Sequence, residues 1–78
     1  MTANDQRIVE ALSNAAIDYD SENFSPDKSF RDNNIDSLDV MSLFLAIEEK
    51  HGVKFSGEEA DAIETPAELS RALDRKLN

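Results

Sequence analysis

The stretch Asp36-Ser37-Leu38-Asp39 decides the fold of this chain, because it marks the start of the most apolar helix in the sequence. Asp36 is a residue type that favours the N-cap position of a helix. The apolar residues that follow are Leu38, Val40, Met41, Leu43, Phe44, Leu45, Ala46 and Ile47. Their spacing predicts a helix from about Ser37 to Lys50, ended by Gly52. Apolar residues on several sides of this helix indicate a central position, with neighbours packed on more than one face.

Capping signals predict three more helices. Thr2-Ala3-Asn4-Asp5 resembles a capping box and opens a first helix that should fade near Ile17. Ser56-Gly57-Glu58-Glu59 fits a capping box for a short helix that reaches about Ile63. Thr65-Pro66-Ala67-Glu68 opens the last helix, with Thr as the N-cap, Pro at the first helical position and Glu at the third.

The segment 18–34 has no sustained hydrophobic period and is predicted to be a long loop. The residues expected to anchor it in the core are Tyr19, Phe24, Phe30 and Ile35. The sequence therefore predicts an all-α fold with a single domain over residues 1–78. Its architecture should be a small four-helix bundle with a long first loop and a short third helix.

Composition and charge limit the classes of partner. Seventeen acidic residues against eight basic ones give a formal net charge of −9, which repels nucleic acid and anionic membranes and attracts basic protein surfaces. The chain has no cysteine, so it has neither a disulfide framework nor a thiolate metal site. No apolar run approaches the ~18 residues of a membrane span. We expect a monomeric, cytoplasmic protein.

Two kinds of site are tested against the sequence and rejected. The only histidine, His51, lies at the far end of the same helix as Ser37, about 21 Å away at 1.5 Å per residue. A serine nucleophile with a histidine base is thereby excluded, and His51 is interpreted as a cation at a helix C-terminus. A calcium-binding loop from Asp18 fails at its two diagnostic positions, which are Asn23 and Ser29. We therefore predict no catalytic residue and no metal site.

Ser37 is the candidate functional residue. It falls in the first turn of its helix, where free backbone N–H groups and the positive end of the helix dipole favour a phosphate ester. The alternative is a serine that only helps to cap the helix, since Ser is common at helix starts. Its position by itself leaves both interpretations open.

From Phe30 to Leu73 the chain resembles acyl carrier proteins. The shared pattern is a loop ending in Asp-Ser-Leu, an apolar helix ending in acid, a short acidic helix and a capped last helix. The resemblance implies that Ser37 bears 4′-phosphopantetheine, derived from coenzyme A, and that acyl groups travel as thioesters on its thiol. It also implies a non-catalytic protein whose partners are a phosphopantetheinyl transferase and acyl-transferring or acyl-modifying enzymes with basic docking surfaces.

Roles for other residues follow from this resemblance. The residues expected to dock partners are Asp36, Leu38, Asp39, Met41, Glu48 and Glu49, although a core role for Met41 is an equal alternative. The residues expected to face the interior, where an acyl chain would shelter, are Phe44, Leu45 and Ile47.

The chain departs from the family pattern in two places. Asn33-Asn34-Ile35 stands where the family often has Leu-Gly and a small residue, and Ser42 stands where many fatty-acid carriers have glutamate. Asn tolerates positive φ, so the turn can survive without glycine. The pathway is left open between fatty-acid, polyketide and specialised lipid or secondary-metabolite synthesis. The alternatives are an aminoacyl or peptidyl carrier with the same arm, and an unmodified acidic helical interaction module.

Overall fold

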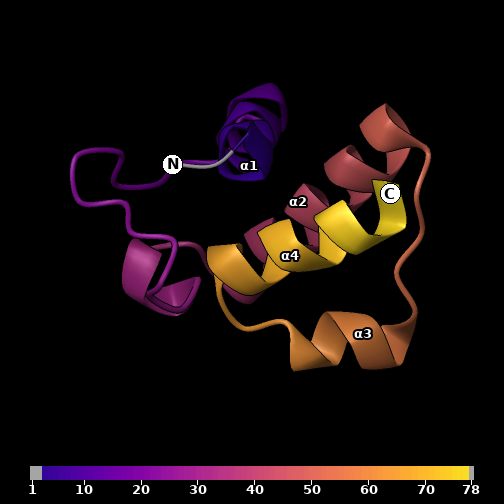
Figure 1. Cartoon of the computed structure of the whole chain (residues 1–78). Helices are drawn as coiled ribbons and strands as arrows, with labels where there is room; N and C mark the ends of the chain where they lie inside the picture. The colour runs from indigo at the N-terminus through magenta and orange to yellow at the C-terminus, as the bar shows by residue number, and fades with distance from the viewer. Residues whose placement is uncertain (1–2, 78) are drawn as a thin grey trace.

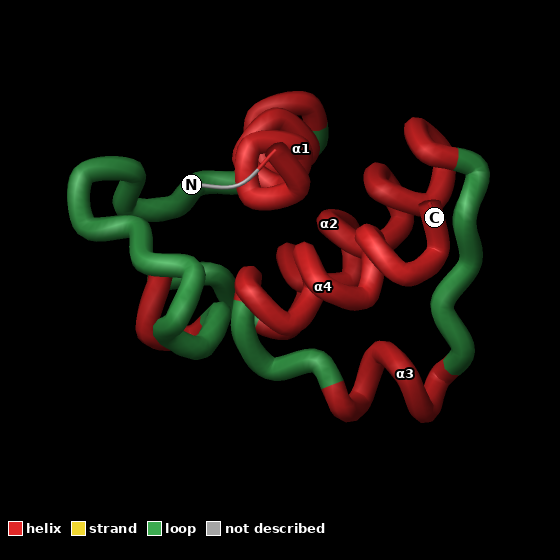
Figure 2. The backbone as a smooth tube through the Cα atoms, in the orientation of Figure 1, coloured by secondary structure: helices red, strands yellow, loops and turns green. Residues whose placement is uncertain are grey.

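A computed structural model describes residues 3–77. The helices are α1 (Ala3–Asn14), the 3₁₀ helix η1 (Arg31–Asn33), α2 (Ser37–His51), α3 (Gly57–Ala62) and α4 (Pro66–Leu77). Within residues 3–77 there is no strand, and loops connect the helices (Figure 2). The predicted all-α class, the four helices and the short third helix are confirmed.

The helix α1 packs against both α2 and α4, and α3 lies along the opposite side of that pair (Figure 1). The buried apolar residues of the core are Ile8, Ala11, Leu12, Ile17, Phe30, Ile35, Leu43, Phe44, Ile47, Leu69, Ala72 and Leu73. They come from α1, α2, α4 and the long loop, whereas no residue of α3 is buried. α2 packs against α1 and buries Leu43, Phe44 and Ile47, but Leu38, Met41 and Leu45 are exposed, so its apolar residues are not packed on all sides as the sequence indicated. α3 depends on partial burial and on polar contacts.

The first helix ends earlier than predicted. α1 stops at Asn14, and Ala16 takes a left-handed conformation with φ of 56°. The N–H of Ile17 then bonds to the carbonyl of Leu12 at 3.0 Å, which closes the helix end and directs Ile17 into the core. The predicted capping box of this helix begins at Thr2, which lies outside the described residues.

The capping boxes predicted for α3 and α4 are confirmed. The Glu59 N–H donates to Ser56 Oγ at 3.1 Å, and the Ser56 N–H donates to Glu59 Oε1 at 2.9 Å. At α4, the Glu68 N–H donates to Thr65 Oγ1 at 3.1 Å, and the Thr65 N–H donates back to Glu68 Oε1 at 3.1 Å. These reciprocal bonds satisfy backbone N–H groups that a helix start leaves without intrahelical partners.

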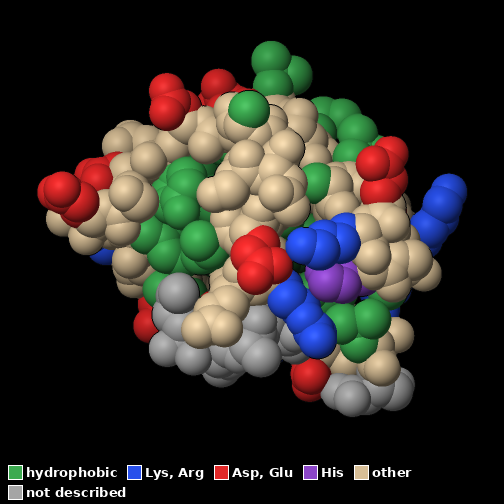
Figure 3. Space-filling model, turned by 90° about the horizontal axis from the view of Figure 1, so that it is seen from above, with side chains coloured by type: hydrophobic (Ala, Val, Ile, Leu, Met, Phe, Trp, Pro, Cys, Tyr) green, Lys and Arg blue, Asp and Glu red, His purple; other side chains and the backbone are tan. Residues whose placement is uncertain are grey.

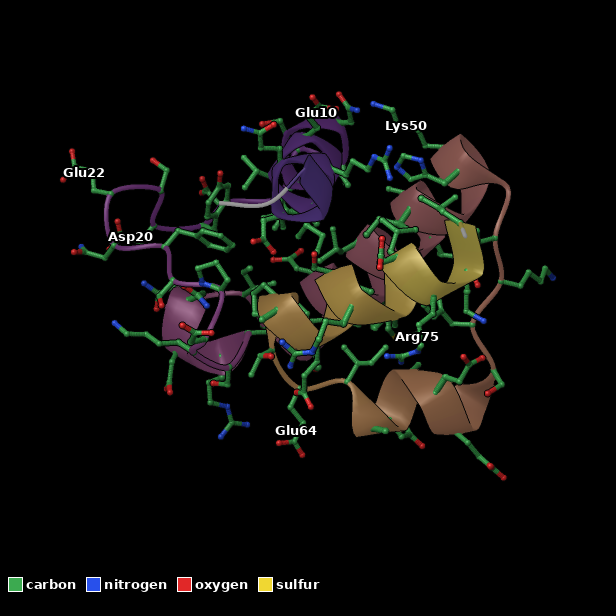
Figure 4. All side chains as sticks on the ribbon, viewed as in Figure 1. Glu10, Asp20, Glu22, Lys50, Glu64 and Arg75 are labelled. Carbon is green, nitrogen blue, oxygen red and sulfur yellow. The ribbon has the colours of Figure 1, made fainter. Side chains whose placement is uncertain are left out.

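One lysine of α4 connects α3 to the rest of the protein. Lys76 Nζ lies 3.0 Å from Glu59 Oε2 and 5.2 Å from the centre of the Phe55 ring. The Phe55 ring in turn meets Phe44 edge to face at 5.3 Å. The Ser56 N–H and Lys76 together lower the pKa of Glu59. The acidic segment around α3 therefore faces basic side chains of α4, among them Arg75 (Figure 4).

The long loop is organised by a buried amide that the sequence did not indicate. Asn33 Nδ2 donates to the carbonyls of Ser25 at 2.9 Å, Ser29 at 3.0 Å and Lys28 at 3.3 Å. Asn33 Oδ1 accepts from the Ser25 N–H at 2.9 Å. The Phe30 N–H bonds to the carbonyl of Glu64 at 3.1 Å, which ties the loop to the start of α4. The segment before α2 is therefore fixed on both sides.

The anchors predicted for this loop lie as expected. Phe30 and Ile35 are buried in the core. Tyr19 and Phe24 are partly buried against it, with their rings edge to face at 5.6 Å. Four apolar contacts and one amide thus hold a segment that has little regular secondary structure of its own.

Candidate functional site

Ser37 is the first residue of α2 and is exposed. Asp36 is the N-cap, as predicted, and its Oδ1 accepts a hydrogen bond from the Asp39 N–H at 2.9 Å. Among residues 3–77 no hydrogen bond engages the Ser37 hydroxyl. Capping is thus done by Asp36, and the Ser37 side chain is left accessible.

A pocket of about 530 Å³ lies beside Ser37. The residues that line it are Phe30, Arg31, Asn34, Ile35, Asp36, Ser37 and Val40. Its volume is within the range of small-molecule sites. The walls combine apolar side chains, one amide and one cation with the serine hydroxyl, so the pocket offers surfaces for both polar and apolar parts of a bound group.

Of the seven residues that line this pocket, only Asp36 and Ser37 were identified from the sequence as site residues, and the polar ones that were missed are Asn34 and Arg31. Asn34 has φ of 62°, and its N–H bonds to the carbonyl of Arg31 at 2.9 Å, which confirms that Asn takes the turn without glycine. Arg31 was missed because it lies in a segment with no periodic pattern. Its signal in the sequence is that it is the only basic residue between Lys28 and Lys50.

The two sides of α2 differ in exposure. Leu38 is 74% exposed, Met41 63% and Leu45 59%. Leu43, Phe44 and Ile47 are buried on the opposite side. We call the exposed apolar set (Leu38, Met41, Leu45) the outer face of α2. It confirms the exposed position of Leu38 and decides between the two alternatives for Met41 in favour of exposure.

The prediction that Leu45 faces the interior is wrong. Leu45 follows Leu38 by seven residues, which is about two helical turns, so both side chains lie on the same side of α2. Phe44 and Ile47 do face the interior, as predicted. An apolar run that covers the whole circumference does not reveal its buried side, because side chains on either side satisfy the same pattern.

The acidic docking candidates fall into two groups. Asp36 and Glu49 are exposed, and Asp39, in the first turn of α2, is half-buried. Glu48 is also half-buried, and its Oε2 accepts a hydrogen bond from the Phe55 N–H at 2.8 Å. The Glu48 carboxylate therefore holds the segment after α2, which differs from the predicted role of presenting charge to a partner.

His51 ends α2, and Gly52 closes it with φ of 64°, as predicted. Burial, together with the positive charges of Arg7 and Lys50, lowers the pKa of His51. This shift disfavours the cationic form of His51 that the sequence interpretation assumed. Basic side chains gather around the histidine on this face (Figure 3), and Lys50 meets Glu10 of α1 at 3.3 Å (Figure 4).

Residues 3–77 contain neither a cluster of metal-ligating side chains nor a helix suited to span a membrane. No three His, Asp or Glu side chains of that range come close enough together to hold an ion. None of the helices there combines the length and the apolar character that crossing a bilayer requires.

Within the described residues, the protein is a small helical bundle with an exposed serine at the first position of α2. Residues 6–73 match the family model described as phosphopantetheine attachment site. An acyl carrier protein from Thermosynechococcus vestitus (strain NIES-2133 / IAM M-273 / BP-1) is 34% identical over 70 residues, which cover 88% of this chain and 86% of that protein. The chain belongs to the acyl carrier protein family.

This membership establishes the prosthetic group and the general role. The protein carries a covalently attached 4′-phosphopantetheine. Members of the family are non-catalytic carriers that interact with a phosphopantetheinyl transferase and with acyl-handling enzymes. The thiol of the group supplies the thioester chemistry, which agrees with a chain that contains no cysteine.

Proposed function

We propose that Ser37 is the attachment residue and that the protein carries acyl intermediates between the enzymes of a biosynthetic pathway. The observation that carries this proposal is that Ser37 is exposed at a helix start with its hydroxyl unengaged, directly beside a pocket. Ser56 also stands at a helix start, but its Oγ is occupied by the Glu59 N–H. Ser37 therefore has the accessibility that a modifying enzyme requires.

The surroundings of Ser37 suit a phosphodiester. Asp36 fixes the first turn of α2 through the Asp39 N–H, so the backbone at Ser37 is held in a helical conformation. The first-turn N–H groups and the positive end of the helix dipole favour an anion at this position. The pocket offers Arg31, Asn34 and apolar walls to the rest of the arm.

The attachment site is tested by mass spectrometry with a matched serine. Incubated with coenzyme A and a phosphopantetheinyl transferase, the parent protein and the Ser56→Ala variant should each gain one phosphopantetheinyl group. Ser37→Ala should gain none, because the accepting hydroxyl is absent. A group found on Ser37→Ala, or mapped to Ser42 in the parent protein, would refute the assignment.

The outer face of α2 is proposed as the docking surface for partner enzymes. Its three apolar side chains are the most exposed large hydrophobic residues within residues 3–77, ahead of Leu77, and exposed apolar surface of this kind is typical of interaction sites. Carboxylates near both ends of α2, at Asp36, Asp39 and Glu49, add the negative charge that attracts basic enzymes. Partner enzymes would then contact the apolar side chains of the outer face, and their approach to it would be steered by the carboxylates.

Charge reversal at the end of this surface tests the docking proposal. Glu49→Lys should slow modification by the transferase several-fold at low salt, because the attraction of a basic partner is reduced. Glu22→Lys is the control, since Glu22 is an exposed residue of the long loop and gives the same change in net charge (Figure 4). Equal rates for both variants over a range of salt concentrations would show that only net charge matters.

Two departures from the family's sequence pattern support a narrower proposal for the biosynthetic pathway. Asn34 in place of glycine and Ser42 in place of glutamate change the surroundings of the arm and remove one carboxylate from α2. Both changes favour a specialised lipid or secondary-metabolite pathway over housekeeping fatty-acid synthesis. We further propose that residues 1–78 act as one carrier domain, as a monomer in the cytoplasm, in agreement with the high net charge and the absence of cysteine.

A further inference from the structure

The pocket beside Ser37 contains one positively charged residue, Arg31. Arg31 is exposed, and within the described part of the chain no carboxylate forms an ion pair with it. Lys28, Lys54, Arg71 and Arg75 also have no ion pair in the described part of the chain, but none of them lines the pocket beside Ser37. The Arg31 guanidinium is therefore available to an anion that is not part of the polypeptide.

The backbone that carries Arg31 is held in place. Asn33, two residues on, is buried and makes four hydrogen bonds to the loop. The N–H of Asn34 bonds to the carbonyl of Arg31 at 2.9 Å, and Phe30 is buried on the other side. A cation on a fixed backbone loses less conformational entropy on binding than one on a mobile loop.

We propose that Arg31 and the pocket next to it form a resting site for the phosphopantetheine arm, with the Arg31 guanidinium facing the phosphodiester. This rests on the proposed attachment at Ser37. Arg31 acts here as a positioning residue. It offsets the repulsion between the phosphodiester and Asp36, which lines the same pocket.

The other walls of the pocket match the remaining chemistry of the arm. Pantetheine has a branched apolar segment and two amide groups, and the pocket is lined by Val40, which is apolar and partly exposed, and by Asn34, which is exposed and bears an amide. Contacts of this kind are individually weak. Covalent attachment makes them effective, because a tethered group is present at millimolar local concentration.

The experiment compares apo and holo protein by NMR. Mass spectrometry first establishes that one group is attached to Ser37. On attachment, the Arg31 Nε–H resonance and the Asn34 side-chain NH₂ resonances should shift, and 0.5 M sodium chloride should reduce the Arg31 shift by screening the contact with the phosphodiester. In Arg31→Gln, the ³¹P resonance of the holo protein should move toward that of free phosphopantetheine esters.

Lys28→Gln is the matched control, because Lys28 is exposed in the same loop, carries the same charge and does not line the pocket. It should leave the ³¹P resonance of the holo protein unchanged. Shifts confined to residues 36–39, with a ³¹P resonance that Arg31→Gln does not move, would overturn the resting site and leave the attachment site intact. Absence of modification at Ser37 would overturn both proposals.

Discussion

Replacing Asn33 with alanine should lower the free energy of unfolding by about 3 kcal/mol. The side chain is buried and makes four hydrogen bonds with the backbone of the long loop. Its removal takes the bonding partner from the Ser25 N–H and the Lys28 carbonyl, whereas the Ser25 carbonyl keeps the Lys28 N–H and the Ser29 carbonyl keeps the N–H of residue 33. A buried unpaired group costs about 1–3 kcal/mol. A protein of this size has about 4–12 kcal/mol of stability in total, so the loss is a large fraction.

Urea denaturation monitored by circular dichroism measures this loss. Asn33→Asp keeps an acceptor oxygen and removes the donor group. It should also destabilise the protein, because the carboxylate would face backbone carbonyls to which it cannot donate. Asn23→Ala is the control in the same loop, because Asn23 is exposed and its side chain bonds only to Asp20 at 2.7 Å. A loss below about 1 kcal/mol for Asn33→Ala would mean that the loop rearranges and pairs its groups elsewhere.

The same residue shows where sequence reasoning reached its limit. The helix starts at Asp36, Ser56 and Thr65 were predictable, because a capping bond joins residues three apart in sequence. Asn33 bonds to backbone groups up to eight residues away, and those groups meet it only once the loop has folded. No local pattern distinguishes it from the exposed Asn34 beside it.

The candidate site was predictable to a similar extent. Asp36 was identified from the capping chemistry of a helix start, and Ser37 from its place in the first turn together with the resemblance to acyl carrier proteins. Arg31 was not identified, because it lines the pocket only in the folded chain, where the left-handed turn at Asn34 joins its segment to the start of α2. Leu45 was placed on the wrong side of α2, because only the packing of α1 and α4 selects which apolar side is buried.

That assignment of the two sides of α2 can be tested with one pair of variants. Ile47→Ala should lower the free energy of unfolding by about 3 kcal/mol, because Ile47 is fully buried and its truncation leaves a cavity between helices. Leu45→Ala, two residues away on the same helix, should change it by less than about 0.5 kcal/mol, since Leu45 is 59% exposed. Urea denaturation measures both values.

The order of the two variants should be reversed when the rate of modification by the transferase is measured. Leu45→Ala removes part of the outer face of α2, so its rate of modification by the transferase should fall at sub-saturating protein concentration while its fold is retained. Ile47→Ala, measured in buffer where it remains folded, should be modified at close to the parent rate. Equal losses of stability for the two variants would show that Leu45 is also packed. The outer face of α2 would then be reduced to Leu38 and Met41, and docking would depend more on the carboxylates.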